Sequence, residues 1–218
     1  MNQPILKKIF TTVGVLGSLY FLYQRYERSN QESEIKFIAN IYYSGDLDSC
    51  EVLLLGFTES NPTNYRGWTF LGNVYLENDR DTLAEHAYLK SIEFQPNDAQ
   101  ALTGLGVIAR IRKNYGEAEK YYEEAIEADP KYAHSYSSLL VLKIIDKKYE
   151  EAVQFGEKAS ELNPEALGIA GNLALAYHYS SLTNKRDSLF AWLEQHQYKD
   201  LLYLKMVTDG LVNLEDLL

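Results

Sequence analysis

The chain has 218 residues, of which 46% are hydrophobic and 24% are charged, a composition typical of a folded globular protein. Its formal net charge of −10 argues against a general nucleic-acid-binding surface, because attraction to phosphates needs a basic face. A single cysteine excludes an intramolecular disulfide and a zinc site built on several thiolates.

The first expected element is a hydrophobic helix within residues 1–30. Its core, residues 9–23, carries no charge and is flanked by Lys8 and Arg25. A helix of that length spans about 22 Å, less than the ~30 Å hydrocarbon core of a bilayer, but basic flanks can reach the headgroups. Residues 1–30 are basic, whereas the remainder of the chain is strongly acidic. We therefore expect an uncleaved single-pass membrane anchor, with a slight preference for an inside N-terminus.

Two other interpretations of this head stay open. A cleaved signal peptide needs small residues after the apolar run, but Arg25, Glu27 and Arg28 follow it here. An amphipathic helix that docks on a partner is the second alternative, although residues 9–23 are apolar on all sides. The expected location is a bacterial inner membrane, with a eukaryotic organelle membrane as the alternative.

Prolines mark a regular period through the rest of the chain. Pro62, Pro96, Pro130 and Pro164 follow one another at intervals of 34 residues, and such a period is typical of a repeat protein. Each of the first four blocks contains a helical pattern, a polar turn and a second helix that the proline ends, and no block alternates with period two. In the fifth block, Tyr198 stands in place of the proline. The sequence predicts an all-α solenoid of about five helix–turn–helix pairs over 31–198, with repeats at 31–64, 65–98, 99–132, 133–166 and 167–198, and then a capping helix at 199–218. A partner-binding tail is the alternative for that last helix.

Certain residue types recur at fixed positions of these blocks. The seventh position is large and apolar in all five, as expected for a residue that packs between helices: Phe37, Leu71, Leu105, Leu139 and Leu173. The twentieth is small in the first four, which lets two helix backbones approach closely: Cys50, Ala84, Ala118 and Ala152. Glycine recurs at the eighth position, at Gly72 and Gly106, and indicates a packing requirement, since glycine destabilises a helix interior by about 1 kcal/mol.

These residues resemble the tetratricopeptide repeat (TPR) family. In the second block, the residues that fall where the family places its Trp, Leu, Gly, Tyr, Ala, aromatic and Pro are Trp68, Leu71, Gly72, Tyr75, Ala84, Tyr88 and Pro96. The third block follows the same pattern, and the fourth departs from it with Leu140 and Gly156. The first block is degenerate, and the fifth loses register after its first helix. The resemblance implies a right-handed solenoid with a concave groove.

The resemblance also implies that the first helices of the repeats line this groove and bind a peptide or helix of a partner protein. The residues expected on its surface are Arg66, Thr69, Phe70, Asn73, Thr103, Val107, Arg110, His134, Ser137, Ser138, Val141, Asn172, Leu175 and His178. Chaperone-binding members of the family grip a C-terminal carboxylate with Lys, Asn and Arg side chains. Here Asn73 is present, but Thr69 and Gly104 replace two of those residues, so that partner is not expected.

No residue pattern points to catalysis. The histidines, His86, His134, His178 and His196, have no second ligand at i+3 or i+4. Cys50 occupies a position that holds alanine in the next three repeats, so a packing role is expected for it. We expect a non-enzymatic protein with no cofactor, no metal site, no small-molecule substrate and no nucleic-acid partner.

The leading hypothesis is a membrane-anchored adaptor or scaffold that holds a partner protein in its groove and assists the assembly of a complex. The alternative is a soluble regulatory or assembly subunit whose N-terminal helix docks on a partner instead of spanning a bilayer.

Overall fold

The structure, a computed structural model, describes residues 16–213, and every regular element within that range is an α-helix. The helices have 13 or 14 residues each, except the first, which has 28, and the last, which has 8. In chain order they are α2 (Leu16–Tyr43), α3 (Leu47–Ser60), α4 (Tyr65–Glu77), α5 (Asp81–Phe94), α6 (Ala99–Ile111), α7 (Tyr115–Ala128), α8 (Ala133–Ile145), α9 (Tyr149–Leu162), α10 (Leu167–Tyr179), α11 (Thr183–Gln195) and α12 (Leu201–Thr208). The predicted all-α fold is confirmed.

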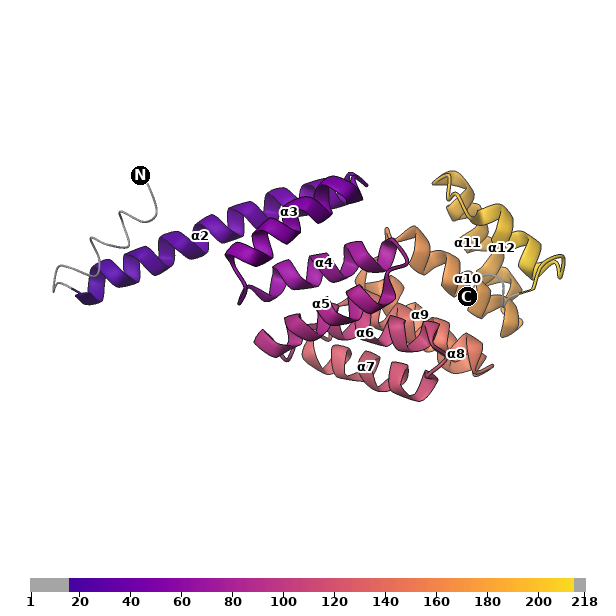
Figure 1. Cartoon of the computed structure of the whole chain (residues 1–218). Helices are drawn as coiled ribbons and strands as arrows, with labels where there is room; N and C mark the ends of the chain where they lie inside the picture. Colours follow the sequence, from indigo (N-terminus) through magenta and orange to yellow (C-terminus); the bar gives the residue numbers. More distant parts are fainter. Residues whose placement is uncertain (1–15, 214–218) are drawn as a thin grey trace.

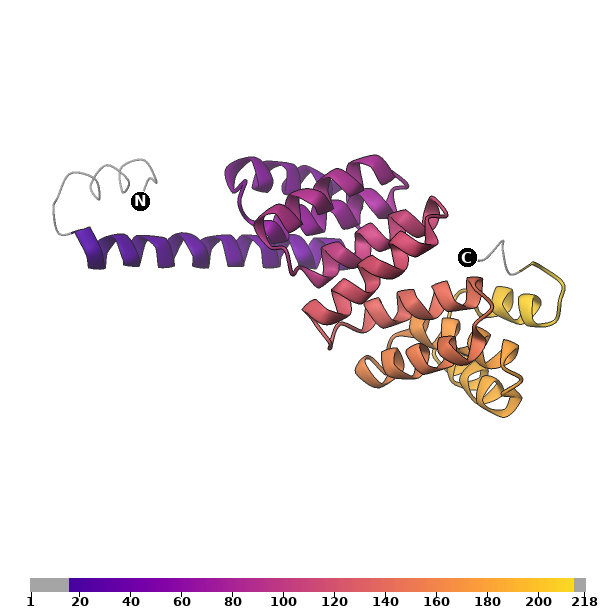
Figure 2. The same cartoon turned by 90° about the horizontal axis from the view of Figure 1, so that it is seen from below.

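Consecutive helices form pairs that stack into an α-solenoid. The helices of each pair pack on each other, and the second helix of one pair packs on the first helix of the next. The first helices also contact one another along the stack, as α4 with α6, α6 with α8 and α8 with α10. Figures 1 and 2 show the succession of pairs from α2 with α3 to α10 with α11, followed by α12, with the N-terminal part of α2 projecting beyond the stack. The first helices therefore share one side of the molecule.

The turn within each pair repeats with the same period as the prolines. It contains a residue in the left-handed backbone region, which is Gly45 (φ 85°), Asp79 (φ 55°), Lys113 (φ 61°), Lys147 (φ 60°) and Ser181 (φ 58°) in successive pairs. In the last four of these turns, the backbone N–H of the residue after the left-handed one donates to the carbonyl of the residue five positions before it, as from Arg80 to Tyr75. This is the hydrogen bond of a Schellman motif, which satisfies carbonyl groups at a helix end.

Glycine lies where a tyrosine ring approaches a neighbouring helix. A Cβ added to Gly72 would stand 2.5 Å from Tyr88, and one added to Gly106 would stand 2.6 Å from Cδ1 of Tyr122. Real Cβ atoms do not approach other atoms this closely, and both tyrosines are almost fully buried. The packing requirement that the sequence indicated at these glycines is therefore present.

In the fourth pair, the small and the large residue of this contact exchange positions. Leu140 takes the place of the glycine on α8, and Gly156 takes the place of the tyrosine on α9. A Cβ added to Gly156 would meet Leu173 at 2.7 Å and Leu140 at 3.0 Å. The two departures from the family pattern therefore compensate each other, because the glycine on α9 leaves space for the leucine on α8.

The first helix departs from the predicted register. Phe37 was expected to pack in the core like Leu71, but 59% of its surface is exposed, whereas Leu71 is 2% exposed. Ile35 and Ile38 point into the core in its place. Leu71 packs in a cluster that includes Phe57 of α3, and within residues 16–213 no helix precedes α2 in the stack to cover Phe37 in the same way.

The predicted membrane anchor lies partly outside the described residues, since its core begins at residue 9 and the described part at residue 16. Residues 16–23 belong to α2, which continues without interruption to Tyr43. Among the helices of residues 16–213, none has the length and apolar character required to cross a membrane.

The last helix covers the end of the stack. α12 buries Leu201, Leu204 and Val207 in the cluster formed by α10 and α11. It ends at Thr208, ahead of Gly210, which has a φ of 73°. The helix expected up to residue 218 is therefore shorter, and residues 214–218 lie outside the described part.

Candidate functional site

Two adjoining hollows lie over the first helices of the pairs, the side on which the groove was expected. The larger has a volume of about 380 Å³ and is formed by α2, α4, α5, α6 and α8. Its lining residues are Tyr42, Tyr43, Asn73, Leu76, Glu77, Tyr88, Gln100, Thr103, Gly104, Val107, Tyr132, His134 and Ser138. We call it the tyrosine pocket.

The second hollow lies beside the first and has a volume of about 320 Å³. Gln100 lines both, so the two adjoin at the start of α6. Lys36 of α2 and Arg66 of α4 contribute positive charge here, with Tyr65 and Phe70 beside them. We call it the basic hollow, and the two hollows together form the groove.

Three residues that the sequence placed on the groove surface are buried. Leu175 is inaccessible within the core of the last pairs, so it cannot touch a partner. Thr69 is 1% exposed, and its hydroxyl donates to Asp98 in a cluster that also holds Ser91. Thr103 donates to the carbonyl of Ala99 at 2.7 Å. The Thr103 hydroxyl also lies 2.9 Å from that of Ser135 on α8, so both threonines face neighbouring helices.

The buried carboxylate of Asp98 connects the second and third pairs. One of its oxygens accepts hydrogen bonds from Thr69 of α4 and Ser91 of α5. The other accepts from the backbone N–H of Gln100 at 3.1 Å, at the start of α6. A carboxylate at a helix N-terminus is favoured by the helix dipole and by the unpaired N–H groups there. This cluster fixes the floor of the basic hollow.

Six of the predicted residues do line the groove with accessible surface. Arg66 and Phe70 border the basic hollow, while Asn73, Val107, His134 and Ser138 border the tyrosine pocket. The other five lie on α6, α8 and α10 with partial exposure but border neither hollow; they are Arg110, Ser137, Val141, Asn172 and His178.

The tyrosine pocket brings together aromatic rings from separate parts of the chain. The ring of Tyr42 lies edge-on to that of Tyr43 at 5.3 Å between centroids, and Tyr132 stacks on His134 at 5.2 Å. Burial lowers the pKa of His134, so its imidazole is neutral near pH 7. Burial also raises the pKa of Tyr132 to about 12, which keeps that phenol neutral.

Glu77, at the end of α4, supplies a carboxylate to the same pocket. Tyr42 donates its hydroxyl to Glu77 Oε1, and burial together with this carboxylate raises the pKa of Tyr42. Tyr88 donates to Asn73 Oδ1 at 2.8 Å, which orients that amide at the pocket wall. The pocket thus combines rings, one carboxylate and hydrogen-bonding groups.

Comparison with known proteins agrees with this architecture. Models of the tetratricopeptide repeat match residues 65–98 and residues 99–132, which are α4 with α5 and α6 with α7. These two helix pairs are tetratricopeptide repeats. The matched ranges coincide with the second and third blocks predicted from the prolines. No curated protein sequence matches the chain.

Solved structures share the TPR fold at low sequence identity. A structure from the functional characterization of Pseudomonas aeruginosa pilF has a TM-score of 0.66 and 19% identity, covering 87% of each chain. A thermophilic TPR protein of Thermus thermophilus has a TM-score of 0.68 and 15% identity, covering 83% of this chain and 97% of that one. The APC/C Cut9–Hcn1 structure has a TM-score of 0.72 and 16% identity, covering 82% of this chain but 36% of that one.

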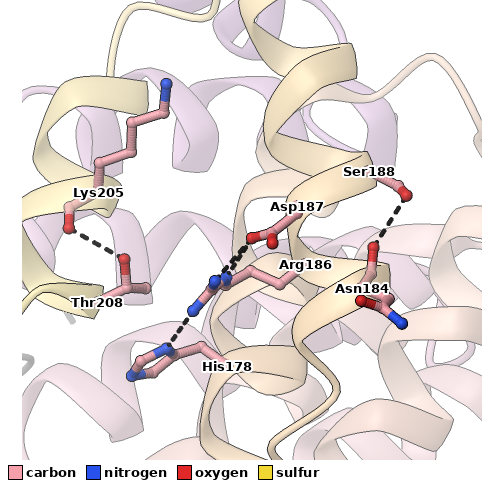
Figure 3. A network of polar contacts seen from close by, with 7 residues as sticks. All are labelled: His178, Asn184, Arg186, Asp187, Ser188, Lys205 and Thr208. Carbon is pink, nitrogen blue, oxygen red and sulfur yellow. Dashed lines mark hydrogen bonds and ion pairs between the residues drawn. The ribbon is translucent and has the colours of Figure 1, made fainter.

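Beyond the two matched repeats, His178 of α10 is held by its neighbours. Figure 3 shows Arg186 of α11 between His178 and Asp187. The guanidinium lies 3.1 Å from His178 Nδ1 and donates to Asp187 Oδ1 at 2.8 Å. Burial and this cation lower the pKa of His178. The side chain is therefore a fixed, neutral part of the last TPR-like pair.

The groove offers aromatic, charged and hydrogen-bonding groups that suit binding. Within residues 16–213, no group of three or more His, Cys, Asp and Glu side chains is placed to hold a metal ion. Cys50 is fully buried, and burial raises the pKa of its thiol to about 11, which opposes formation of a reactive thiolate. Its environment fits the predicted packing role.

The sequence did not identify several residues of the groove. Tyr42, Tyr43 and Glu77 lie at the C-terminal ends of first helices, and Tyr132 precedes α8. The predicted residues came from the second to fifth repeats, so Tyr42 and Tyr43 of the first were not among them, and Glu77 and Tyr132 were not named either. The adjacent tyrosines at the end of the first helix of the first block were a signal that could have drawn attention to this end of the groove.

Proposed function

We propose that this chain is a protein-interaction adaptor that holds a segment of a partner protein in the groove formed by the basic hollow and the tyrosine pocket. The main observation behind this proposal is that the two hollows adjoin at Gln100 and together extend over α2, α4, α6 and α8. The TPR fold and its solved relatives support a protein partner. A surface with apolar, aromatic and hydrogen-bonding groups suits a peptide or helix.

A site-specific photo-crosslink tests this function in the intact chain. p-Benzoylphenylalanine is introduced at Val107, which lines the tyrosine pocket, and separately at Glu123, an exposed residue of α7. After irradiation in the native host, the Val107 probe should yield a discrete crosslinked protein that the Glu123 probe does not. Equal yields from both positions, or no product from Val107, would contradict the proposal.

We further propose that residues 9–23 attach the adaptor to a membrane, in the first place a bacterial inner membrane. The support comes from the sequence: an uncharged run with basic flanks ahead of an acidic body. Assembly of a partner complex would then take place near the bilayer.

Alkaline carbonate extraction of cell membranes distinguishes this attachment from docking on a partner. An integral anchor keeps the full chain in the membrane pellet, and a variant with Val13→Asp and Leu16→Asp should move to the supernatant. Release of the unchanged chain by carbonate would favour the alternative, a soluble regulatory or assembly subunit whose N-terminal helix docks on a partner protein.

A further inference from the structure

The walls of the tyrosine pocket present aromatic surface from two sides. Tyr42 and Tyr43 come from the end of α2, and Tyr132 and His134 come from the start of α8. Tyr43 is 75% exposed, so much of its ring is open to an incoming group. The face of an aromatic ring carries negative potential and attracts cations within about 6 Å of its centre.

Charge in the groove is divided between its two parts. Glu77 is the one formally charged residue among those that line the tyrosine pocket, and it is exposed. In the basic hollow, Lys36 and Arg66 are the accessible charged residues, while Asp98 is buried and hydrogen-bonded. A bound segment therefore meets a negative aromatic site at one end and a positive site at the other.

Glu77 is held in place by one hydrogen bond, and its carboxylate can accept further hydrogen bonds. Tyr42 donates to its Oε1, while a carboxylate has about four lone-pair positions over two oxygens. A cation beside this carboxylate forms a charge-assisted hydrogen bond, which is stronger than one between neutral groups.

We propose that the tyrosine pocket receives a lysine or arginine side chain of the partner segment. This inference rests on the proposed function and names the chemistry of the segment at one site. The rings contact the apolar stem and the cation, and Glu77 pairs with its charge. The formal net charge of −10 on the chain also favours approach of a basic segment.

Other occupants fit this pocket less well. An apolar side chain would remove water from the carboxylate of Glu77 and return no hydrogen bond, and burying an unpaired charge is unfavourable. An acidic side chain would meet the same carboxylate with like charge. The volume of about 380 Å³ leaves room for a long side chain together with part of its backbone.

Fluorescence polarisation with matched peptides tests the inference on the full chain in detergent micelles. The probes are dye-labelled dodecapeptides of alanine, leucine and glutamine that differ only at one central residue: lysine, arginine, norleucine or glutamate. The lysine and arginine peptides should bind about fivefold more tightly than the norleucine peptide, because norleucine keeps the stem and lacks the charge. The glutamate peptide should bind most weakly.

Variants assign the preference to the pocket. Glu77→Gln and Tyr43→Ala should each remove most of the preference for lysine over norleucine. The matched controls, Glu123→Gln on α7 and Tyr26→Ala on the projecting part of α2, should leave it unchanged, because both residues are exposed and outside the pocket.

Equal affinities for the lysine and norleucine peptides, or a preference insensitive to Glu77→Gln, would overturn this inference while leaving the groove as a peptide site. Absence of binding by all four peptides would overturn it as well. The proposed function is decided separately, by the photo-crosslink at Val107.

Discussion

Exchanging the sizes of two packed residues in the third pair should reproduce the arrangement found in the fourth. Gly106 lies against Tyr122, whereas the equivalent residues in the fourth pair are Leu140 and Gly156. The perturbation is the pair of substitutions Gly106→Leu and Tyr122→Gly, made singly and together.

Each single substitution should destabilise the fold for a different reason. A Cβ at position 106 would already stand 2.6 Å from Cδ1 of the fully buried Tyr122 ring, and a leucine adds more atoms there, so overpacking should cost about 1–3 kcal/mol. Tyr122→Gly removes a buried aromatic ring and places glycine inside α7, so its cost should be about 4–6 kcal/mol. Together, the leucine can occupy space that the ring leaves. The double variant should therefore lose less stability than the sum of the two single losses, by at least ~1 kcal/mol.

Urea unfolding of the full chain, followed by far-ultraviolet circular dichroism, measures the four free energies of this cycle. Gly116→Ala in α7 is the control for adding a side chain, because nothing lies within 4 Å of the Cβ it would add. That variant should be at least as stable as the parent. A double variant whose loss equals or exceeds the sum of the single losses would refute the packing argument.

Three other stability predictions follow from separate contacts, each measured by thermal unfolding against the parent. Lys147→Gly should raise the free energy of unfolding by about 0.5–1 kcal/mol, because glycine adopts the φ of 60° without strain, and a loss of stability would contradict this. Thr69→Val removes a donor from the buried carboxylate of Asp98 and should cost about 1–3 kcal/mol, whereas a neutral result would mean that the cluster contributes nothing. Arg112 donates two hydrogen bonds of 2.8 Å to Glu85 and lowers the pKa of that carboxyl, so Glu85→Gln should cost about 0.2–1 kcal/mol at pH 7. Because the folded-state pKa is the lower one, this contribution is present above the unfolded-state pKa and should disappear as the pH falls through the folded-state value; a cost that persists in acid would contradict the assignment.

The repeat period and the central packing could be predicted from the sequence because each repeat meets nearly the same neighbours. The prolines gave the phase, and the phase placed Leu71, Leu105 and Gly106 correctly in the core. Phe37 shares that phase but is exposed. Burial at this position of the repeat requires a helix pair on each side, and within residues 16–213 no pair precedes the first one.

The groove was harder to predict because accessibility depends on three-dimensional neighbours. Thr69 and Thr103 lie on first helices as expected, but Thr69 bonds to Asp98 and the Thr103 hydroxyl lies 2.9 Å from that of Ser135 on α8, so both side chains are almost fully buried. Tyr43 and Tyr132 are 89 positions apart in the sequence, and only the superhelical stacking of α2, α6 and α8 brings them to one pocket.

The affinity of the crosslinked partner for the parent chain and for Val107→Trp tests the central claim most directly. Val107 lines the tyrosine pocket with partial exposure, and a tryptophan there should fill the hollow that the partner occupies. Isothermal titration calorimetry should give at least a tenfold loss of affinity for Val107→Trp, with no loss for Glu123→Trp on α7, provided that both variants unfold at temperatures near that of the parent. An unchanged affinity for a folded Val107→Trp chain would show that the partner binds elsewhere and would contradict the account.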